Sequence, residues 1–230
     1  IRDSIWGTGA VMEDVNQDGL LDIYVCASGF PDAKKRKNLL FINNGDLTFT
    51  ESAKEFGLDE DGYSTQAVFF DYDKDDDLDM LVARDPYDVF HNDIGYVRTK
   101  KKGSNLPGSD KLYRNDGDNK FKDVSQEAGI LDEGYSLGVA VSDINKDGWP
   151  DIYISNDFQT DDILYINNKD GSFDNETSKY LKHTEFAGMG VSVADINNDA
   201  YPDIFVADMM PEDNQRLKMI IPTPRYDKFN

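Results

Sequence analysis

A nine-residue acidic segment that occurs four times constrains this chain more than any other feature. The copies span residues 14–22, 71–79, 143–151 and 195–203, and each keeps an oxygen-bearing side chain at positions 1, 3, 5 and 9. This spacing lets a short loop curl so that alternate side chains face one hard cation, and Ca²⁺ takes about 6 to 8 oxygen ligands in flexible geometry. Asp, Asn and Gly also populate ordinary turns, but four copies in register predict calcium loops.

The residues that flank the loops exclude an EF-hand. An EF-hand needs a helix on each side and a bidentate glutamate at loop position 12. This chain has Val25, Val82, Ile154 and Val206 there. Those residues lie in short β-branched and aromatic runs typical of strands, and apolar residues alternate with period two before each loop. Each unit is therefore predicted as strand, calcium loop, strand.

A second repeated element follows each of the first three loops. Asn-rich turns stand between apolar runs at residues 40–49, 112–121 and 164–173, and such turns supply the positive φ angles of tight hairpins. The separation is 28 residues from Asn43 to Asp71, from Asn115 to Asp143 and from Asn167 to Asp195. A constant interval indicates one repeated structural unit. Two strands around the calcium loop and two around the turn give four strands per unit.

Four short strands repeated at this spacing are typical of the blades of a β-propeller. The predicted fold class is all-β, a β-propeller of four-stranded blades with Ca²⁺-binding loops. One domain covers residues 1–230, with units at about 7–58, 63–130, 135–182 and 187–217 and an insertion at about 85–110. RTX β-rolls need Gly-rich nonapeptides and dockerin-like modules need helices, so both fit less well.

Charge and composition restrict the partners. The chain has a formal net charge of -21, and much of its acidity lies in the four loops. Nucleic-acid binding is not expected, because phosphate contacts need clustered Lys and Arg. No apolar run approaches the roughly 18 residues of a membrane span, and Cys26 is the only cysteine, which excludes an intrachain disulfide.

The loops and the Leu-Tyr-x-Asn-Asn-Gly-Asp hairpins resemble FG-GAP/VCBS repeats, and residues 151–157 and 203–212 are similar to the propeller of ASPIC/UnbV proteins related to cartilage acidic protein. The resemblance covers the chain from about Gly7 to Leu217. It implies an extracytoplasmic calcium-loaded propeller, frequent in bacterial surface proteins, with integrin α heads as distant relatives.

The same resemblance implies up to four Ca²⁺ ions and a set of ligands. The side-chain ligands are Asp14, Asn16, Asp18 and Asp22; Asp71, Asp73, Asp75 and Asp79; Asp143, Asn145, Asp147 and Asp151; and Asp195, Asn197, Asp199 and Asp203. Backbone carbonyls of Leu20, Asp77, Trp149 and Tyr201 complete them. Asp76 and Ala200 stand where Gly is expected. Ala tolerates a left-handed backbone poorly, so the fourth site departs most from the pattern.

The function is predicted as a binding or adhesion module for a protein or glycan, with structural calcium, in the extracellular space, on a bacterial cell surface or in the periplasm. Propellers host enzymes as well, and the alternative is a calcium-dependent polysaccharide lyase. No catalytic residue is assigned, because His91 and His183 lie in no recognisable catalytic motif. A cluster of Lys, Tyr, His or Arg on one rim would favour the lyase.

Two parts of the chain carry further expectations. The insertion mixes aromatic and basic residues, which suits an anionic glycan or a protein, or else it packs over a blade edge. The fourth unit has no Asn-Gly hairpin after Asp208, which leaves about three and a half blades, whereas related families often build seven. We expect the remaining blades beyond Asn230 or in another chain, and a four-bladed ring closed by the N-terminal residues is the alternative.

Overall fold

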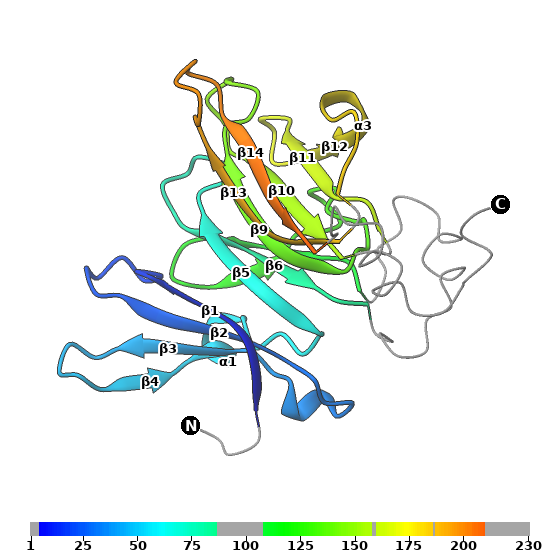
Figure 1. Ribbon diagram of the computed structural model, residues 1–230. Helices are drawn as coiled ribbons and strands as arrows, with labels where there is room; N and C mark the ends of the chain where they lie inside the picture. The colour runs from blue at the N-terminus through cyan, green and yellow to red at the C-terminus, as the bar shows by residue number, and fades with distance from the viewer. Residues whose placement is uncertain (1–4, 87–107, 158–159, 186, 210–230) are drawn as a thin grey trace.

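The computed structural model describes residues 5–86, 108–157, 160–185 and 187–209, which form four antiparallel sheets in chain order (Figure 1). The first contains β1 (Trp6–Glu13), β2 (Asp22–Ser28), β3 (Leu39–Asn43) and β4 (Phe49–Glu51). The second contains β5 (Ser64–Phe70), β6 (Asp79–Arg84), β7 (Lys111–Asn115) and β8 (Phe121–Asp123). The third contains β9 (Ser136–Ser142), β10 (Asp151–Asn156), β11 (Ile163–Asn167) and β12 (Phe173–Asn175). The fourth contains β13 (Gly188–Ala194) and β14 (Asp203–Asp208).

Each four-stranded sheet is a meander whose strands pair with their neighbours in sequence. The predicted hairpins close where expected, with Asn43 opposite Phe49, and the second and third sheets repeat this pairing. Short helices η1 (Ala33–Lys35), α1 (Ala53–Phe56) and α3 (Thr177–Tyr180) lie in the connections. The predicted fold class, all-β with four-stranded blades, is confirmed. The predicted bounds of the domain and its units stay a prediction.

Apolar layers between successive sheets form the core. Between the first and second sheets, Tyr24 and Phe69 meet edge to face with ring centroids 5.9 Å apart. Between the second and third sheets, Leu81 and Ile152 are completely buried in a second cluster. A smaller cluster around Tyr153 joins the third sheet to β13 and β14. Burial of apolar surface therefore stacks the sheets face to face, as blades do.

The first strands β1, β5, β9 and β13 lie side by side and carry a one-residue bulge at the same place. The bulged residues are Thr8, Thr65, Leu137 and Met189. A bulge re-aims one side chain. Thr8 Oγ1 donates to the carbonyl of Ser64 at 2.6 Å, and Thr65 Oγ1 donates to the carbonyl of Ser136 at 2.5 Å. Each threonine thus ties its sheet to the next.

Glycines next to these bulges permit the close approach of neighbouring sheets. A Cβ added to Gly9 would lie 2.4 Å from the carbonyl oxygen of Thr65. A Cβ added to Gly138 would lie 2.6 Å from Ser155 Oγ and 3.1 Å from the backbone nitrogen of Val191. The glycines five residues before the loops are therefore explained by packing between sheets in the first and third units.

A buried Asn or Asp precedes the third strand of each complete sheet. Asn38 Oδ1 accepts the N–H of Ala27 at 2.7 Å, Asp110 Oδ1 accepts that of Arg84 at 2.8 Å, and Asp162 Oδ1 accepts that of Asn156 at 2.8 Å. All three side chains are 1% exposed or less. Each one satisfies a backbone donor at the end of the second strand, at the opposite end of the sheet from the acidic loop.

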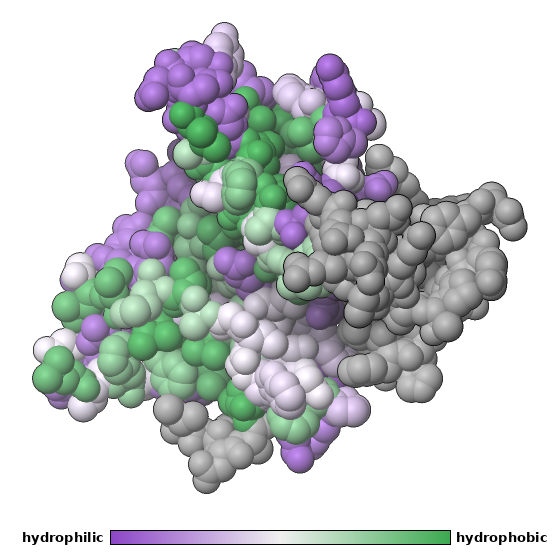
Figure 2. Space-filling model, viewed as in Figure 1, coloured by the Kyte–Doolittle hydropathy of each residue, from purple (hydrophilic) through white to green (hydrophobic). Residues whose placement is uncertain are grey.

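The fourth sheet exposes apolar surface that the other sheets bury. Phe205 of β14 is 60% exposed, whereas the same position holds Tyr24 at 1%, Leu81 at 0% and Tyr153 at 2%. Figure 2 shows hydrophobic surface over β13 and β14 on this side of the molecule. Within the described ranges β14 pairs only with β13. The expected remaining blades stay a prediction.

Several expectations fall on residues that the structure does not describe. Residues 87–107 of the predicted insertion, with His91, and residues 210–217 of the fourth unit lie outside the described residues. His183 is described and exposed. Of the helices in the described ranges, none has the length and apolar character needed to span a membrane.

Candidate metal centres

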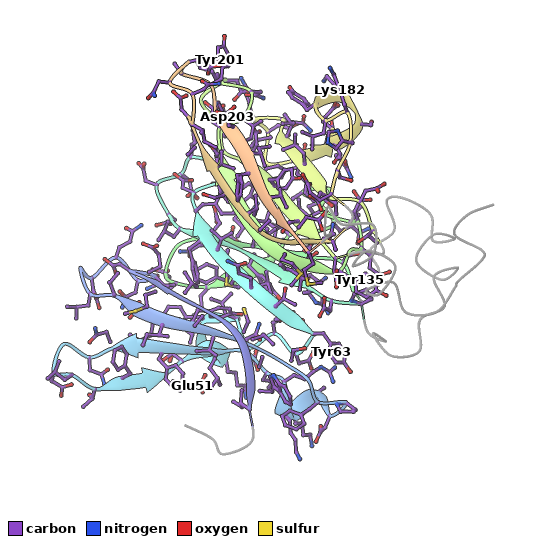
Figure 3. All side chains as sticks on the ribbon, in the orientation of Figure 1. Glu51, Tyr63, Tyr135, Lys182, Tyr201 and Asp203 are labelled. Carbon is purple, nitrogen blue, oxygen red and sulfur yellow. The ribbon has the colours of Figure 1, made fainter. Side chains whose placement is uncertain are left out.

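Each candidate metal loop joins the first strand of a sheet to the second. The loops β1–β2, β5–β6, β9–β10 and β13–β14 therefore lie at the same end of their sheets (Figure 1). Tyr201 and Asp203 mark this end of the fourth sheet in Figure 3, whereas Tyr63 and Tyr135 lie at the opposite ends of the second and third sheets. The topology places all four predicted sites on one side of the molecule.

The aspartate at position 1 curls each loop back on itself. In the third loop, Asp143 Oδ1 accepts the N–H of Asp147 at 2.9 Å and Oδ2 accepts the N–H of Gly148 at 2.7 Å. Asp14, Asp71 and Asp195 make the same two bonds with positions 5 and 6 of their loops. A carboxylate oxygen that accepts one N–H keeps further acceptor capacity, so these oxygens remain available to a cation.

The aspartate at position 5 fixes the tip of each loop. Asp147 Oδ1 accepts the N–H of Trp149, at position 7, at 3.0 Å. Asp18, Asp75 and Asp199 accept the N–H of Leu20, Asp77 and Tyr201 in the same way. In the three loops with asparagine at position 3, its Oδ1 accepts the position-5 N–H and its Nδ2 donates to the position-5 carboxylate. The predicted ligands at positions 1, 3, 5 and 7 thus belong to one hydrogen-bonded turn.

Two residues of every loop adopt a left-handed backbone. At position 6, φ is 87° at Gly19, 72° at Asp76, 88° at Gly148 and 66° at Ala200. The expectation that Asp76 and Ala200 stand where Gly is favoured therefore has a structural basis. Position 4 is also left-handed, at Gln17, Lys74, Lys146 and Asn198. This left-handed position was not predictable from the sequence, because glutamine and lysine have no special preference for positive φ.

The aspartate at position 9 connects the loop to the hairpin of its own sheet. Asp151 Oδ2 accepts the N–H of Ile144 at 2.9 Å, and Oδ1 accepts the N–H of Asn167 at the end of β11 at 2.9 Å. Asp22 and Asp79 make the equivalent bonds, and all three side chains are completely buried. Asp203 makes the first of these bonds, to Ile196, at 3.0 Å. Position 9 therefore has a structural role that ligand spacing alone did not reveal.

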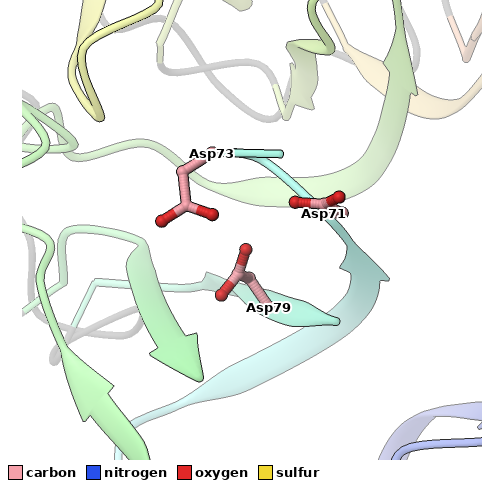
Figure 4. Close-up of side chains that lie close together, drawn as sticks. All are labelled: Asp71, Asp73 and Asp79. Carbon is pink, nitrogen blue, oxygen red and sulfur yellow. The ribbon is translucent and has the colours of Figure 1, made fainter. Parts of the chain in front are cut away.

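The second loop brings three carboxylates together. Asp71, Asp73 and Asp79 each offer an oxygen within 4.8 Å of the others (Figure 4). Asp73 Oδ1 is buried and has no hydrogen-bond donor among the described residues. Burial raises the pKa of Asp79 to about 7, and it also raises the pKa of Asp73, with the neighbouring carboxylates adding to both effects. A divalent cation at this point would satisfy the free oxygen and relieve the repulsion.

The second loop also differs from the other three loops at position 3. It has Asp73 at position 3, where the other loops have asparagine. Arg114 occupies the β7 position that corresponds to Ile42 and Ile166 in the other sheets. The positive charge of Arg114 lowers the pKa of Asp73 against the effect of burial. The additional carboxylate of Asp73 and the additional guanidinium of Arg114 thus occur in the same sheet, and their opposite charges offset each other.

The donor set in all four loops fits a hard cation. Every predicted side-chain ligand is a carboxylate or an amide oxygen, and Ca²⁺ prefers such ligands over nitrogen and sulfur. Burial raises the pKa of Asp22 and Asp151 as well as that of Asp79, so each complete sheet holds a buried carboxylate beside further acids. The identity and number of the ions stay predictions.

A family model described as FG-GAP-like repeat matches residues 14–82, 92–154 and 143–206. Integrin alpha-6 of Homo sapiens is 36% identical over 86 residues, which cover 33% of this chain and 8% of integrin alpha-6. The chain therefore spans a small part of that relative.

Among solved structures, the chain is similar to a lectin from Agrocybe aegerita, described for its specific recognition of non-reducing terminal N-acetylglucosamine. The TM-score is 0.43 at 19% sequence identity, and the match covers 85% of this chain and 45% of the lectin chain.

Proposed function

The chain belongs to the FG-GAP-like repeat family, and from this premise we propose that it is a calcium-binding β-propeller that serves as a binding or adhesion module for a protein or glycan. The observation that carries the proposal is the shared geometry of the four loops, in which the aspartates at positions 1 and 5 make the same hydrogen bonds each time. Within the family, residues 151–157 and 203–212 favour the ASPIC/UnbV group. Family membership and the likeness to integrin alpha-6 support a location outside the cytoplasm, on a cell surface or in the periplasm.

Calcium is proposed to stabilise the fold, with the predicted residues at positions 1, 3, 5, 7 and 9 as ligands. The loops hold several carboxylates close together, and a cation that binds only the folded state stabilises it by mass action. For a dissociation constant of about 1 mM, typical of extracellular modules, about 10 mM calcium contributes about 1.4 kcal/mol per site. Four such sites would raise the melting temperature of a domain of this size by about 10–20 °C.

The test compares thermal unfolding in calcium and in chelator, with metal analysis of both samples. We expect up to four equivalents of calcium in the first sample and a melting temperature lower by about 10 °C or more in the second. Asp199→Ala should remove one equivalent and retain the other three. An unchanged melt in protein that metal analysis shows to be stripped would refute the structural role of calcium.

The proposed partner site is the insertion at about 85–110, most of which lies outside the described residues. The flanking strands β6 and β7 pair with each other, so a variant that joins Pro86 to Gly108 through a short Gly-Ser linker keeps both strands. We expect this variant to lose partner binding and to keep the calcium-dependent melt. Loss of folding would instead show that the insertion packs against a blade edge.

One observation bears on the lyase alternative. A crevice of about 450 Å³ between the second and third sheets is lined by Tyr72, Arg114 and Lys169 on the loop side. Arg114 donates to Asp116 at 2.6 Å, and Lys169 lies 3.3 Å from Asp147, so both cations are paired. Burial raises the pKa of Tyr72 to about 12, which makes its phenol a poor base at neutral pH.

The paired cations and the raised pKa of Tyr72 argue against catalysis in this crevice. The test is incubation with acidic polysaccharides, followed by ultraviolet absorbance of the unsaturated product that elimination creates. We expect no increase in absorbance, and an increase that Tyr72→Phe abolishes would establish the lyase.

A further inference from the structure

Side chains at position 4 of the calcium loops reach across to the next loop. Lys74 of the second loop places Nζ 5.0 Å from the ring centroid of Trp149 in the third loop. Lys146 of the third loop places Nζ 4.1 Å from the ring centroid of Tyr201 in the fourth. Gln17 of the first loop donates from Nε2 to the carbonyl of Asp76 in the second at 2.8 Å. Every described pair of neighbouring loops is therefore bridged from position 4.

The repeat explains why these contacts recur. Position 4 is left-handed in each loop, with φ of 58° at Gln17, 61° at Lys74 and 61° at Lys146, so the three side chains leave the backbone in equivalent directions. The residue contacted by each lysine, Trp149 or Tyr201, is at position 7. The N–H of position 7 is bonded to the position-5 aspartate, and its carbonyl is a predicted calcium ligand. The bridge therefore ends on a residue whose placement belongs to the next metal site.

The third and fourth loops enclose a crevice beside the Lys146 bridge. A crevice of about 480 Å³ is lined by Asp143 and Lys146 of the third loop and by Asp195 and Tyr201 of the fourth. Tyr201 is 61% exposed, so the Lys146 contact lies at the surface. A cation over an aromatic ring at an exposed site is worth a fewfold change in an equilibrium constant.

We infer that these bridges couple calcium binding between neighbouring loops, an inference that rests on the proposed calcium role. A bridge forms only when both loops hold their turns. An empty loop, whose carboxylates repel one another, loses part of that order and with it the bridge. Occupancy of one loop therefore favours occupancy of the next, and the effect is reciprocal. From the strength of exposed cation–π contacts we expect about a two- to fivefold change in affinity per bridge.

Terbium, which replaces calcium at oxygen sites and luminesces when a nearby indole absorbs light, reports the third loop through Trp149. Because Trp149 also lies beside the second loop, titrations with the second loop intact are fitted to two sites. The chain has two tryptophans, and Trp6 lies at the opposite end of its strand from the loop. Trp6→Phe leaves Trp149 as the only indole donor. In this background Asp71→Asn with Asp75→Asn removes metal binding by the second loop. Lys74→Met removes the bridge and keeps an unbranched side chain of similar length at the same left-handed position.

The four variants form a double-mutant cycle. Disabling the second loop should lower the terbium affinity of the third loop about two- to fivefold when Lys74 is present, and should leave it unchanged when Lys74→Met is present. Lys74→Arg should retain the coupling. Lys169→Met, which removes a cation beside Asp147 without touching the bridge, is the matched control and should leave the coupling ratio unchanged.

The outcomes separate this inference from the proposed function. Equal terbium affinities with the second loop intact and disabled would overturn the coupling and leave calcium binding in place. Coupling that survives Lys74→Met would overturn the role of the bridge. Absence of sensitised luminescence in every variant would overturn the proposed calcium role as well. If the disabled variant does not fold, the steepness of terbium binding with all loops intact gives the second measurement, and it should fall in Lys74→Met but not in Lys74→Arg.

Discussion

Replacement of Asp110 by asparagine should stabilise this protein at pH 8 and remove part of its pH dependence. Asp110 is completely buried before β7, where Oδ1 accepts the N–H of Arg84 at 2.8 Å and Oδ2 accepts the hydroxyl of Ser136 at 3.3 Å. The first sheet shows that asparagine fits this position. Asn38 accepts the equivalent N–H with Oδ1 and donates from Nδ2 to Ser64, the counterpart of Ser136, at 2.9 Å.

The sign and size of the expected stability change follow from the burial of Asp110. Burial raises the pKa of Asp110 from 3.8 to about 7, against smaller opposing effects of its hydrogen bonds and of Arg84. The folded state therefore disfavours the ionised carboxyl, so its cost is absent below about pH 4 and complete above about pH 7. A pKa raised this far lowers the free energy of unfolding above pH 7 by about 4 kcal/mol. Because the variant also loses the attraction between Arg84 and the carboxylate, we expect the free energy of unfolding to rise by about 2–4 kcal/mol at pH 8 and to change little at pH 4.

The assay is urea unfolding between pH 4 and pH 8 at a fixed excess of calcium, with free energies from linear extrapolation. Asp85, whose pKa burial also raises to about 7, titrates in both proteins and its charge adds to the raised pKa of Asp110, so the difference between variant and wild type reports Asp110 together with its repulsion by Asp85. The reverse change, Asn38→Asp in the first sheet, is the matched control and should destabilise at pH 8. A variant that is less stable than wild type at pH 8, or a difference that does not grow with pH, would refute this reasoning.

Three further changes test the loops and the packing of the sheets. Ala200→Gly should raise the free energy of unfolding by about 1 kcal/mol, because Gly relieves a left-handed backbone, and Gly148→Ala should lower it by a similar amount; chemical denaturation of both checks this, and equal stabilities would contradict it. Asp151→Ala should cost about 2–4 kcal/mol in calcium-free protein, because buried N–H groups lose their acceptor, and an unchanged urea midpoint in chelator would argue against the structural role of position 9. Gly9→Ala should cost about 2 kcal/mol or more, because its Cβ would meet the neighbouring sheet, whereas Gly190→Ala, with no described atom within 4 Å of the new Cβ, should be neutral by thermal melting.

The sequence was sufficient for the blade architecture because two independent patterns repeat in it. Strands flank every acidic loop as expected, and the constant interval between hairpin and next loop is the stretch from Asn43 through β4 of one sheet to β5 and Asp71 of the next. The bulges at Thr8 and Thr65 were not predictable, because alternation of apolar residues does not reveal a one-residue shift in pairing. They became visible only from the register of β1 with β2 and of β5 with β6.

The ligand set stays a prediction, but the structure gives some of its residues second roles that the sequence does not show. Spacing identified position 9 as a potential ligand, but the bonds from Asp151 to Ile144 and Asn167 depend on where the hairpin ends in space. The bridge from Lys74 to Trp149 joins residues far apart in sequence, and no local pattern marks it. Contacts between repeats depend on how sheets stack, which a motif within one repeat does not encode.

The separation of loops and connections onto opposite ends of the sheets has a consequence for how such a protein diversifies. Acidic turns at one end tolerate little change in length, because each side chain must return to the same point. At the other end, the connections that follow Ser28, Arg84 and Asn156 differ in length and composition, and an insertion there leaves every acidic turn in place. Natural variants, and designers who graft peptides onto this scaffold, can therefore change the surface at one end without changing the acidic turns at the other.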